Sequence, residues 1–349
     1  MHEAMLYEKL SNQRVRCRLC AHYCTIANGH KGLCQVRENR AGTLYTLVYG
    51  RTISQAGDPI EKKPLYHFHP GSRSFSIATP GCNFRCAWCQ NWEISQMPRE
   101  QHLIGGHSAT PEQIVTKAQL AGCQSIAYTY TEPTIFFEYA RDTAMLARAA
   151  GLANVFVSNG YLSEEALEMT KGWLDAANID LKAFREETYQ HHIGAHLQPV
   201  LDSLRRIKAL GIWLEVTTLI VPGLNDDPQE LKDLAEFLVK ELGPDTPWHI
   251  SRFFPCYMMQ QTPPTPVATL HRAEEIGREA GLRHIYLGNV AEETNTFCPD
   301  CGQLLIRRVG FNVVENTLLP GGRCPDCEET VAGVGMAEAD PQPSKLPHF

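Results

Sequence analysis

The stretch "TPGCNFRCAWCQNW", residues 79–92, holds three cysteines in one short loop behind a Pro-Gly pair. Cys82, Cys86 and Cys89 are separated by three and then by two residues. A tetrahedral zinc site and an ordinary iron–sulfur cluster each take four protein ligands, and this loop supplies three. The loop therefore indicates a metal centre with one position open to another molecule, or else a zinc knuckle or cluster completed by a ligand from elsewhere in the chain.

The composition is that of a globular protein with one large domain and small attachments. The chain has 349 residues, of which 43% are hydrophobic and 20% are charged. Its net charge of −7 argues against broad non-specific binding to nucleic acids or anionic membranes. No run approaches the roughly eighteen apolar residues of a membrane-spanning helix, and the first residues have no signal-peptide pattern. We therefore expect a cytoplasmic protein without a membrane segment.

Thirteen cysteines are many for such a chain, and most of them are clustered. Tight Cys-x-x-Cys spacing in a long chain without a secretion signal is typical of metal binding or redox chemistry. Cys123 and Cys256 stand alone, and we expect them to pack as small apolar side chains. The clustered cysteines are Cys17, Cys20, Cys24 and Cys34, then Cys82, Cys86 and Cys89, and finally Cys298, Cys301, Cys324 and Cys327.

Between the second and third clusters, apolar runs alternate with amphipathic segments. Thr110 and Pro111 mark the start of one expected helix, and Asp227 and Gly243 bracket another. This alternation predicts a parallel sheet, either a barrel or a doubly wound sheet. About six or seven units suit a partial barrel better than an eightfold one, so we expect an α/β fold with a partial (β/α)6 TIM-like barrel. The expected strands are residues 73–79, 124–130, 154–160, 176–181, 213–221, 248–254 and 283–289.

Polar residues gather at the carboxyl ends of these expected strands. In barrels of this kind the active site lies at that end, although polar residues also begin ordinary loops. The strand-end positions therefore predict a site, with solvated loop residues as the alternative. The residues concerned are Cys82, Glu132, Asn159, Asp180, Lys182 and Asn289.

The cysteine spacing, with Trp88 just before the last cysteine, resembles the cluster loop of the radical S-adenosylmethionine (SAM) superfamily. The stretch "GDPIEKKPLYHFHPGSRSFSIATPGCNFRCAWCQNWEISQ", residues 57–96, is similar to enzymes related to the pyruvate formate-lyase activating enzyme. More narrowly, it is similar to the radical SAM enzymes of the AmmeMemoRadiSam system, and the likeness covers nearly the whole chain.

This resemblance implies a specific chemistry. The three cysteines would hold a [4Fe–4S] cluster, and SAM would occupy the open iron. One-electron reduction would cleave SAM to methionine and a 5′-deoxyadenosyl radical, which would abstract hydrogen from a substrate. No residue would act as nucleophile or general base, so no catalytic residue is named. A glycyl-radical-activating activity is one form that the reaction could take.

The resemblance also implies residues of a SAM pocket. Glu132 belongs to the Glu-Pro part of the second strand's motif, Asn159 follows the third strand, and Asp180 and Lys182 form an intact Asp-Leu-Lys. Charges two residues apart on a strand face the same side, so the last two could meet the zwitterionic methionine group, with a rim salt bridge as the alternative. Trp88 joins these residues as an expected cofactor contact.

Several positions depart from the relatives' pattern. Thr217 stands where an arginine is expected, and Tyr257 stands where a histidine is expected. His249 is a candidate replacement for a ribose contact. His67, in a His-x-His pair with His69, could line the approach to the active site, with a surface position as the alternative.

The two terminal cysteine sets predict further metal sites. Two Cys-Pro-Asp-Cys knuckles flank residues 304–318, which read as a hairpin, and this pattern is typical of a closed zinc ribbon, with the single iron of a rubredoxin as the alternative. The N-terminal set is compatible with zinc or with an auxiliary [4Fe–4S] cluster. We expect a cysteine-rich segment at 1–50, the barrel at 51–290, the knuckle domain at 291–333 and a flexible tail at 334–349.

Two classes of function follow from these patterns. One is a radical SAM enzyme supplied with electrons by a flavodoxin or ferredoxin, with a Memo-like or AMMECR1-like partner implied by the resemblance. The other is an iron–sulfur electron carrier or metal-binding scaffold that never cleaves SAM. The expected SAM pocket favours the enzyme, because an electron carrier has no use for it. The ribbon has few basic residues, which argues against nucleic acid as a partner.

Overall fold

The computed structural model describes residues 1–337, and its centre is one eight-stranded sheet. Seven strands are parallel, as the sequence predicts, and each lies within or overlaps an expected run. An eighth strand, β8 (Ser54–Pro59), pairs antiparallel with β9 and has no counterpart among the expected strands. The parallel strands are β9 (Arg73–Ala78), β11 (Ser125–Tyr128), β12 (Ala153–Ser158), β13 (Ala176–Asp180), β14 (Trp213–Ile220), β15 (Trp248–Arg252) and β16 (Ile285–Gly288).

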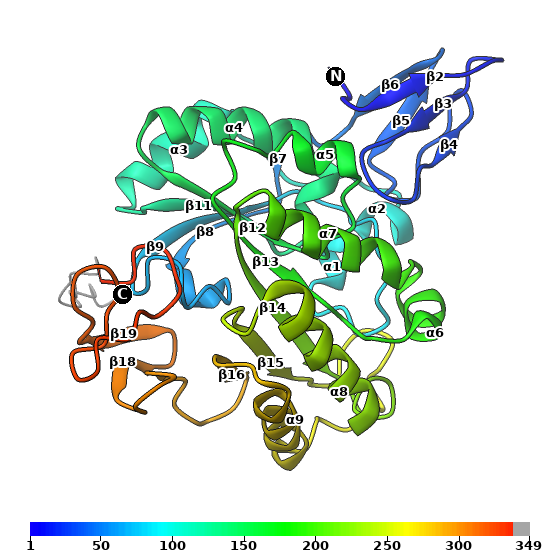
Figure 1. Ribbon diagram of the computed structural model, residues 1–349. Coiled ribbons are helices and arrows are strands. Elements are labelled where there is room, and N and C mark those ends of the chain that lie inside the picture. The colour runs from blue at the N-terminus through cyan, green and yellow to red at the C-terminus, as the bar shows by residue number, and fades with distance from the viewer. Residues whose placement is uncertain (338–349) are drawn as a thin grey trace.

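The strand order shows that the barrel is partial. The order is β16-β15-β14-β13-β12-β11-β9-β8, so β16 and β8 are the two edges of the sheet in the described part of the chain. The larger helices cover the outer face of the curved sheet (Figure 1). They are α3 (Pro111–Leu120), α4 (Phe137–Ala149), α5 (Glu164–Glu168), α7 (Leu197–Ala209), α8 (Pro228–Phe237) and α9 (Val267–Ala280).

Shorter elements connect the main ones. Two single-turn helices, α1 and α2, follow the cysteine loop directly, and β7 pairs with β10 beside the main sheet. The short helices are α1 (Trp92–Ser95), α2 (Met97–Glu100) and α6 (Glu186–Thr188), with 3-10 turns η1 (Ile60–Lys62) and η2 (Pro133–Phe136), and π turns η3 (Tyr189–Ile193) and η4 (Leu238–Leu242). The paired short strands are β7 (Arg51–Thr52) and β10 (His107–Ser108).

The expected helix boundaries are confirmed. Thr110 Oγ1 accepts a hydrogen bond from Gln113 N, and the Gln113 side chain accepts one from Thr110 N, which completes a capping box at α3. At α8, Asp227 Oδ1 accepts from Glu230 N at 3.0 Å. That helix continues through the π turn η4 and ends at Gly243. Each cap satisfies main-chain N–H groups that the first helical turn leaves without a partner.

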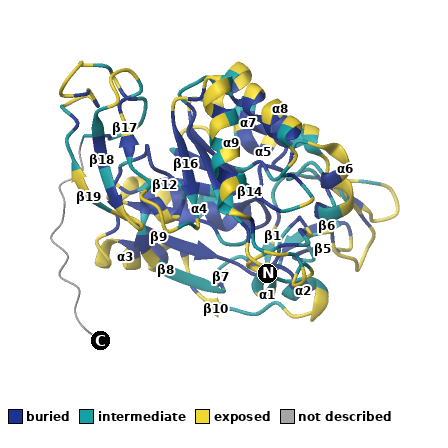
Figure 2. Cartoon of the chain, turned by 90° about the horizontal axis from the view of Figure 1, so that it is seen from below, coloured by how far each residue is buried: buried dark blue, intermediate teal, exposed yellow. Residues whose placement is uncertain are grey.

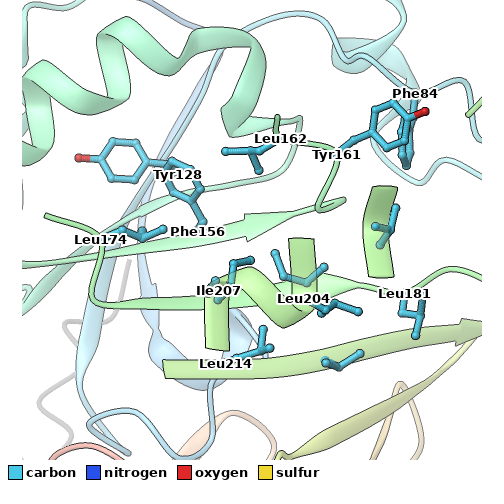
Figure 3. Packing of buried hydrophobic residues seen from close by; sticks show 14 of the residues in the cluster. Phe84, Tyr128, Phe156, Tyr161, Leu162, Leu174, Leu181, Leu204, Ile207 and Leu214 are labelled. Carbon is cyan, nitrogen blue, oxygen red and sulfur yellow. The ribbon is translucent and has the colours of Figure 1, made fainter. Parts of the chain in front are cut away.

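The hydrophobic core lies between the sheet and its helices. Figure 3 shows Leu204 and Ile207 of α7 packed above Leu214 of β14, all of them buried. Figure 2 shows buried residues concentrated in the strands, with the exposed residues on the outer faces of the helices. This distribution holds the strands in register and fixes the positions of the loops at their carboxyl ends. No described helix is both long and apolar enough to cross a membrane.

The first fifty residues form two small antiparallel sheets that share the barrel's core. Val15, Leu19 and Val36 are buried in the same hydrophobic cluster as the barrel strands. The buried Arg37 side chain pairs with Glu138 of α4, which ties this segment to the barrel. The sheets are β1 (His2–Glu3), β6 (Thr43–Thr46) and β5 (Arg37–Arg40), and β2 (Tyr7–Lys9), β3 (Val15–Cys17) and β4 (Thr25–Ile26).

The C-terminal segment has a small core of its own. The expected hairpin is confirmed: β18 (Leu304–Val309) pairs antiparallel with β19 (Asn312–Asn316), and β17 (Thr296–Phe297) adds a third strand. Figure 1 shows this segment and the N-terminal strands at opposite sides of the barrel. The expected tail starts at 334, but Val334 N donates to His67 O at 2.8 Å; residues 338–349 lie outside the described part. The four-part division of the chain stays a prediction.

Candidate active site

One cavity of about 240 Å³ opens at the carboxyl ends of the parallel strands. Each parallel strand from β9 to β16 places at least one wall residue in its carboxyl-terminal half or just beyond its end, so the sheet itself positions the site. The strand-end residues that the sequence singles out lie together in this wall. They are Cys82, Glu132, Asn159, Asp180, Lys182 and Asn289, and Cys86, Cys89 and Trp88 line the same cavity.

Main-chain hydrogen bonds hold the cysteine loop in place. Arg85 N donates to Ile193 O at 2.8 Å, and Ala87 N donates to His192 O at 2.9 Å. On the other side, Met258 N donates to Ala87 O at 3.1 Å. The loop is therefore clamped between the π turn η3 and the segment after β15, and its cysteines are positioned before any metal binds.

The thiols of Cys82 and Cys86 are poor anions without a cation. Burial raises the pKa of the Cys86 thiol to about 12. Burial, followed by the charge of Glu132, raises the pKa of Cys82 well above its usual range. A bound metal reverses this preference, because thiolate is the form that ligates metal and binding releases the proton. The three cysteines fit a metal centre. Among the described residues, no fourth cysteine lines this cavity, and other side chains complete its wall.

Glu132 is a buried carboxylate that ties the ends of two strands together. It accepts hydrogen bonds from Thr134 N at 3.0 Å and from Thr134 Oγ1 at 2.5 Å, both at Oε1. Across the sheet it accepts from Ser158 Oγ and Asn159 N, both at 2.8 Å. Burial raises its pKa, although these hydrogen bonds act in the opposite direction. A carboxylate offers about four acceptor sites; three of these hydrogen bonds go to Oε1 and one to Oε2, so most of the capacity of Glu132 is used within the chain.

Asn159 connects the end of β12 to the cysteine loop. Its Nδ2 donates to Asn83 Oδ1 at 2.8 Å and lies 3.9 Å from Cys82 Sγ. Its Oδ1 accepts from Tyr161 N at 3.1 Å, which fixes the orientation of the amide. Sequence reasoning did not find Asn83, because only the contact between two distant loops shows its part in the site.

Asp180 and Lys182 form an ion pair of 2.9 Å in the cavity wall. Burial alone lowers the pKa of Lys182, but the charges of Asp180 and Cys86 and the hydrogen bond to Asp180 together outweigh it and raise the pKa above its ordinary value. The Asp180 side chain is 34% exposed and that of Lys182 is 17% exposed. Lys182 therefore stays charged at neutral pH, and both side chains remain reachable from the cavity.

Other residues of the wall carry polar groups as well. Thr217, in the position where the relatives have an arginine, lines the cavity and donates from Oγ1 to Asn178 Oδ1 at 2.8 Å. Ser251 and Tyr130 line it as well. Ser251 lies near the end of an expected strand and could have been found by the strand-end rule. Tyr130 has a φ of 63°, a left-handed conformation that no sequence pattern here indicates.

Two histidine hypotheses are wrong. His249 is buried and its Nε2 lies 2.6 Å from Glu215 Oε2, near the amino ends of β14 and β15. Its side chain therefore lies below the cavity, towards the amino ends of the strands, and is not part of the cavity wall, so it does not replace a ribose contact there. His67 is fully buried at that same end, where its Nε2 lies 2.5 Å from the Tyr286 hydroxyl, so it is neither a surface residue nor part of the site approach.

The C-terminal cysteines form a compact metal-ligand group. Cys298 and Cys327 Sγ lie 3.5 Å apart, and Cys301 and Cys324 Sγ lie 3.6 Å apart. All four sulfurs fall within 4.8 Å of one another. Four thiolates around one ion at about 2.3 Å lie about 3.8 Å apart in a tetrahedron. This set is therefore suited to a single closed metal ion.

The partial barrel, the three-cysteine loop and the cavity above it define a class of protein. Residues 76–238 match the family described as the Radical SAM superfamily. The chain belongs to this superfamily, whose fold implies a [4Fe–4S] cluster and SAM. The donor set fits that group, because three positioned thiols and a charged wall share one cavity.

Individual relatives extend the comparison. An uncharacterised protein of Methanocaldococcus jannaschii is 46% identical over 334 residues, which cover 95% of this chain and 99% of that protein. GTP 3′,8-cyclase of Aquifex aeolicus is 27% identical over 174 residues, covering 47% of this chain and 52% of the cyclase, so the match spans about half of that enzyme. Among solved structures, a domain of pyruvate-formate lyase-activating enzyme from Bacteroides vulgatus aligns at 18% identity with a TM-score of 0.41, covering 47% of this chain and 99% of that domain.

Proposed function

We propose that this protein reductively cleaves SAM at a cluster held by Cys82, Cys86 and Cys89 and directs the resulting radical to a hydrogen atom of a substrate. The observation that carries the proposal is the single cavity shared by those cysteines and by the charged Asp180–Lys182 pair. When bound, the cluster supplies the electron that breaks the carbon–sulfur bond of SAM. Membership of the superfamily supports an enzymatic activity, and the substrate is left for experiment to identify.

The residues of the cavity suit a zwitterionic methionine group. Lys182 can donate to its carboxylate, and Asp180 can accept from its ammonium, so the pair exchanges an internal ion pair for two contacts with the ligand. In this proposal Glu132 acts indirectly, by positioning other residues. It fixes Asn159, which in turn orients the loop at Asn83 beside Cys82.

The apolar part of the cavity wall would also protect the radical from side reactions. Phe84 and Trp88 are buried apolar walls of the site, and Leu219 adds a further apolar face. Such surroundings exclude water and competing hydrogen donors from a reactive species. A glycine of a partner protein is one substrate to test, because residues 57–96 resemble glycyl-radical-activating enzymes.

We further propose that the C-terminal cysteines hold zinc, and that a flavodoxin- or ferredoxin-class protein donates the electrons. The single-ion spacing of the sulfurs supports a closed structural site, and closed sites of four cysteines usually hold zinc. The Memo-like or AMMECR1-like partner stays a proposal that rests on the narrower resemblance to the AmmeMemoRadiSam system.

Product analysis tests the proposal. Anaerobically reconstituted protein with SAM and dithionite should release 5′-deoxyadenosine and methionine, measured by mass spectrometry. Cys86→Ala should abolish both products, whereas the matched variant Cys123→Ala, at a lone cysteine outside the cavity, should retain them. Deuterium transfer from labelled candidates into 5′-deoxyadenosine then identifies the substrate. A protein that contains its clusters but releases no 5′-deoxyadenosine would be the electron carrier instead.

A further inference from the structure

A second cavity lies under the cysteine loop, and all four N-terminal cysteines line it. Its volume is about 20 Å³, enough to hold an object of at least water size. Asn83, the neighbour of Cys82, belongs to its wall, as does Thr134, which binds Glu132. The N-terminal cysteines, which the radical SAM reaction itself does not require, therefore converge on one space beside the active site. They are Cys17, Cys20, Cys24 and Cys34.

The spacing of these thiols differs from that of the zinc-like set. Four thiolates closed around one zinc lie about 3.8 Å apart and leave no room for a water-sized object between them. The C-terminal sulfurs have this compact arrangement. In the described part of the chain, no three of the N-terminal cysteines have this compact arrangement. Wider spacing around a central void is what a [4Fe–4S] cluster needs, because its thiolates bind different irons.

The site is built from fixed backbone. Cys17 N donates to Cys24 O at 2.9 Å, and Ser163 N donates to Leu19 O at 3.1 Å, which docks the segment onto the start of α5. Arg37 also lines the cavity and is 2% exposed. Its guanidinium places a positive charge beside the thiolates, and Glu138 fixes its position. A buried cation offsets part of the negative charge of a four-thiolate cluster.

The two cysteine sites are in direct contact. His22, between Cys20 and Cys24, donates from Nε2 to Asn83 O at 2.9 Å. Gly81, just before Cys82, has a φ of +105°, and a Cβ there would lie 2.8 Å from Val36 Cγ1 and 3.4 Å from Cys34 O. Glycine at this position lets the two loops approach this closely. One hydrogen bond, from His22 to Asn83, therefore connects the segment of Cys20 directly to the segment of Cys82.

We propose that Cys17, Cys20, Cys24 and Cys34 bind an auxiliary [4Fe–4S] cluster through which electrons reach the cluster of the SAM site. A low-potential ferredoxin- or flavodoxin-class donor loses one electron, the auxiliary site takes it up, and the same electron moves on to the SAM site. The auxiliary site returns to its oxidised state, and no bond forms or breaks. The transfer step rests on the function proposed above, whereas the identity of the N-terminal metal centre does not.

Metal counting tests the identity of the site. The full-length variant Cys82→Ala/Cys86→Ala/Cys89→Ala, reconstituted anaerobically, should retain about four irons and four sulfides per chain, as expected for one [4Fe–4S] cluster. Adding Cys20→Ala/Cys24→Ala should remove them. If the first variant holds no iron and the wild-type N-terminal set holds zinc instead, the proposal is overturned. The N-terminal ligands are intact in the first variant, so its result stands even where the second does not fold.

Reduction kinetics test the electron route. In Cys20→Ala/Cys24→Ala, dithionite should still reduce the SAM-site cluster, measured by electron paramagnetic resonance (EPR) on frozen samples. Reduction by a photoreduced flavodoxin or ferredoxin should be lost. Reduction by the protein donor at the wild-type rate would contradict the route. A failure of SAM cleavage alone would instead count against the proposed function, because neither metal content nor cluster reduction depends on it.

Discussion

Asn159 Nδ2 donates to Asn83 Oδ1 at 2.8 Å, and the main-chain carbonyl of the same Asn83 accepts from His22. One residue of the cysteine loop therefore contacts both the end of β12 and the N-terminal cysteine segment. This relationship explains why the first fifty residues share the barrel's core. The SAM site and the N-terminal cysteine site are parts of one packed unit.

The Asp180–Lys182 pair should contribute directly to SAM affinity. We expect Asp180→Asn or Lys182→Met to lose about 1.5–3 kcal/mol of binding free energy, or roughly tenfold to over a hundredfold in Kd. Isothermal titration of the reconstituted protein measures this. The control is Lys232→Met, whose exposed pair with Glu236 lies outside the cavity. Unchanged SAM affinity in both cavity variants would make the pair a plain salt bridge.

Glu132→Gln should destabilise the fold rather than only weaken SAM binding. The carboxylate of Glu132 accepts four hydrogen bonds. In glutamine an N–H₂ group replaces one of its oxygens and cannot accept them, so at least one buried donor loses its partner. We expect the free energy of unfolding to fall by about 1–3 kcal/mol in urea titrations. The exposed Glu187→Gln is the matched control. Full stability of Glu132→Gln together with weaker SAM binding would instead favour a direct contact between Glu132 and SAM.

Sequence patterns predicted the parallel strands well because each is an apolar run bounded by turn residues, and they predicted α3 and α8 because their caps are local. The same local logic missed β8, whose sequence "SQAGDP" carries glycine and proline and reads as a turn. Strand-end residues were found because parallel strands bring their carboxyl ends to one edge. Strands and helix caps are therefore predictable here because they depend on residues near one another in the sequence.

The wrong predictions and the unpredicted site residues have one physical cause, which is contact between segments far apart in the chain. His67 and His249 read as site or surface residues, but a buried network around Glu215 holds both below the cavity, towards the amino ends of the strands. Asn83 and Tyr130 carry no signal outside their contacts with other loops. No periodicity or spacing in one chain encodes such pairings.

The C-terminal segment should stabilise the barrel through Arg308. Its Nη2 donates to Tyr66 O at 2.9 Å, and its Nε lies 3.6 Å from Glu61 Oε1, with both side chains fully buried. Breaking a buried ion pair leaves an uncompensated charge and costs about 3–5 kcal/mol. We expect Arg308→Met to lose stability of this order in thermal or urea unfolding, and the exposed neighbour Arg307→Met to lose little.

The Arg308→Met loss should also depend on pH. Burial raises the pKa of Glu61 to about 7 even with Arg308 present. A group whose folded pKa is raised binds its proton more tightly in the folded state, so stability falls as pH rises from the unfolded pKa to the folded pKa and is constant above it. Arg308 lowers the pKa of Glu61, so without Arg308 the folded pKa is higher and the loss of stability continues to higher pH. The cost of Arg308→Met should therefore be larger at pH 8 than at pH 6. An equal cost at both values would show that Glu61 is not the group left unpaired.

Deleting residues from Ala291 onward should also destabilise the barrel, because the deletion removes Arg308 together with the C-terminal metal site.

Acid should unfold the protein partly through His284. Burial lowers its pKa to about 4, and its ring lies 4.4 Å from that of His67. The unfolded state binds this proton near its ordinary pKa, so stability falls as pH drops from about 6.5 towards 4, by roughly 3 kcal/mol for this group. His284→Gln should flatten that part of the pH–stability curve, and the exposed His102→Gln should not. An equally steep curve in His284→Gln would assign the acid sensitivity to other groups.

The central claim is that Cys82, Cys86 and Cys89 hold a cluster with an iron open to SAM. The most direct measurement is the EPR spectrum of the dithionite-reduced protein with and without SAM, recorded on wild type and on Cys82→Ala/Cys86→Ala/Cys89→Ala. We predict that SAM changes the wild-type signal and leaves the signal of the variant unaltered, whatever iron its N-terminal set retains. A wild-type spectrum indifferent to saturating SAM, or a variant that still responds, would contradict the account.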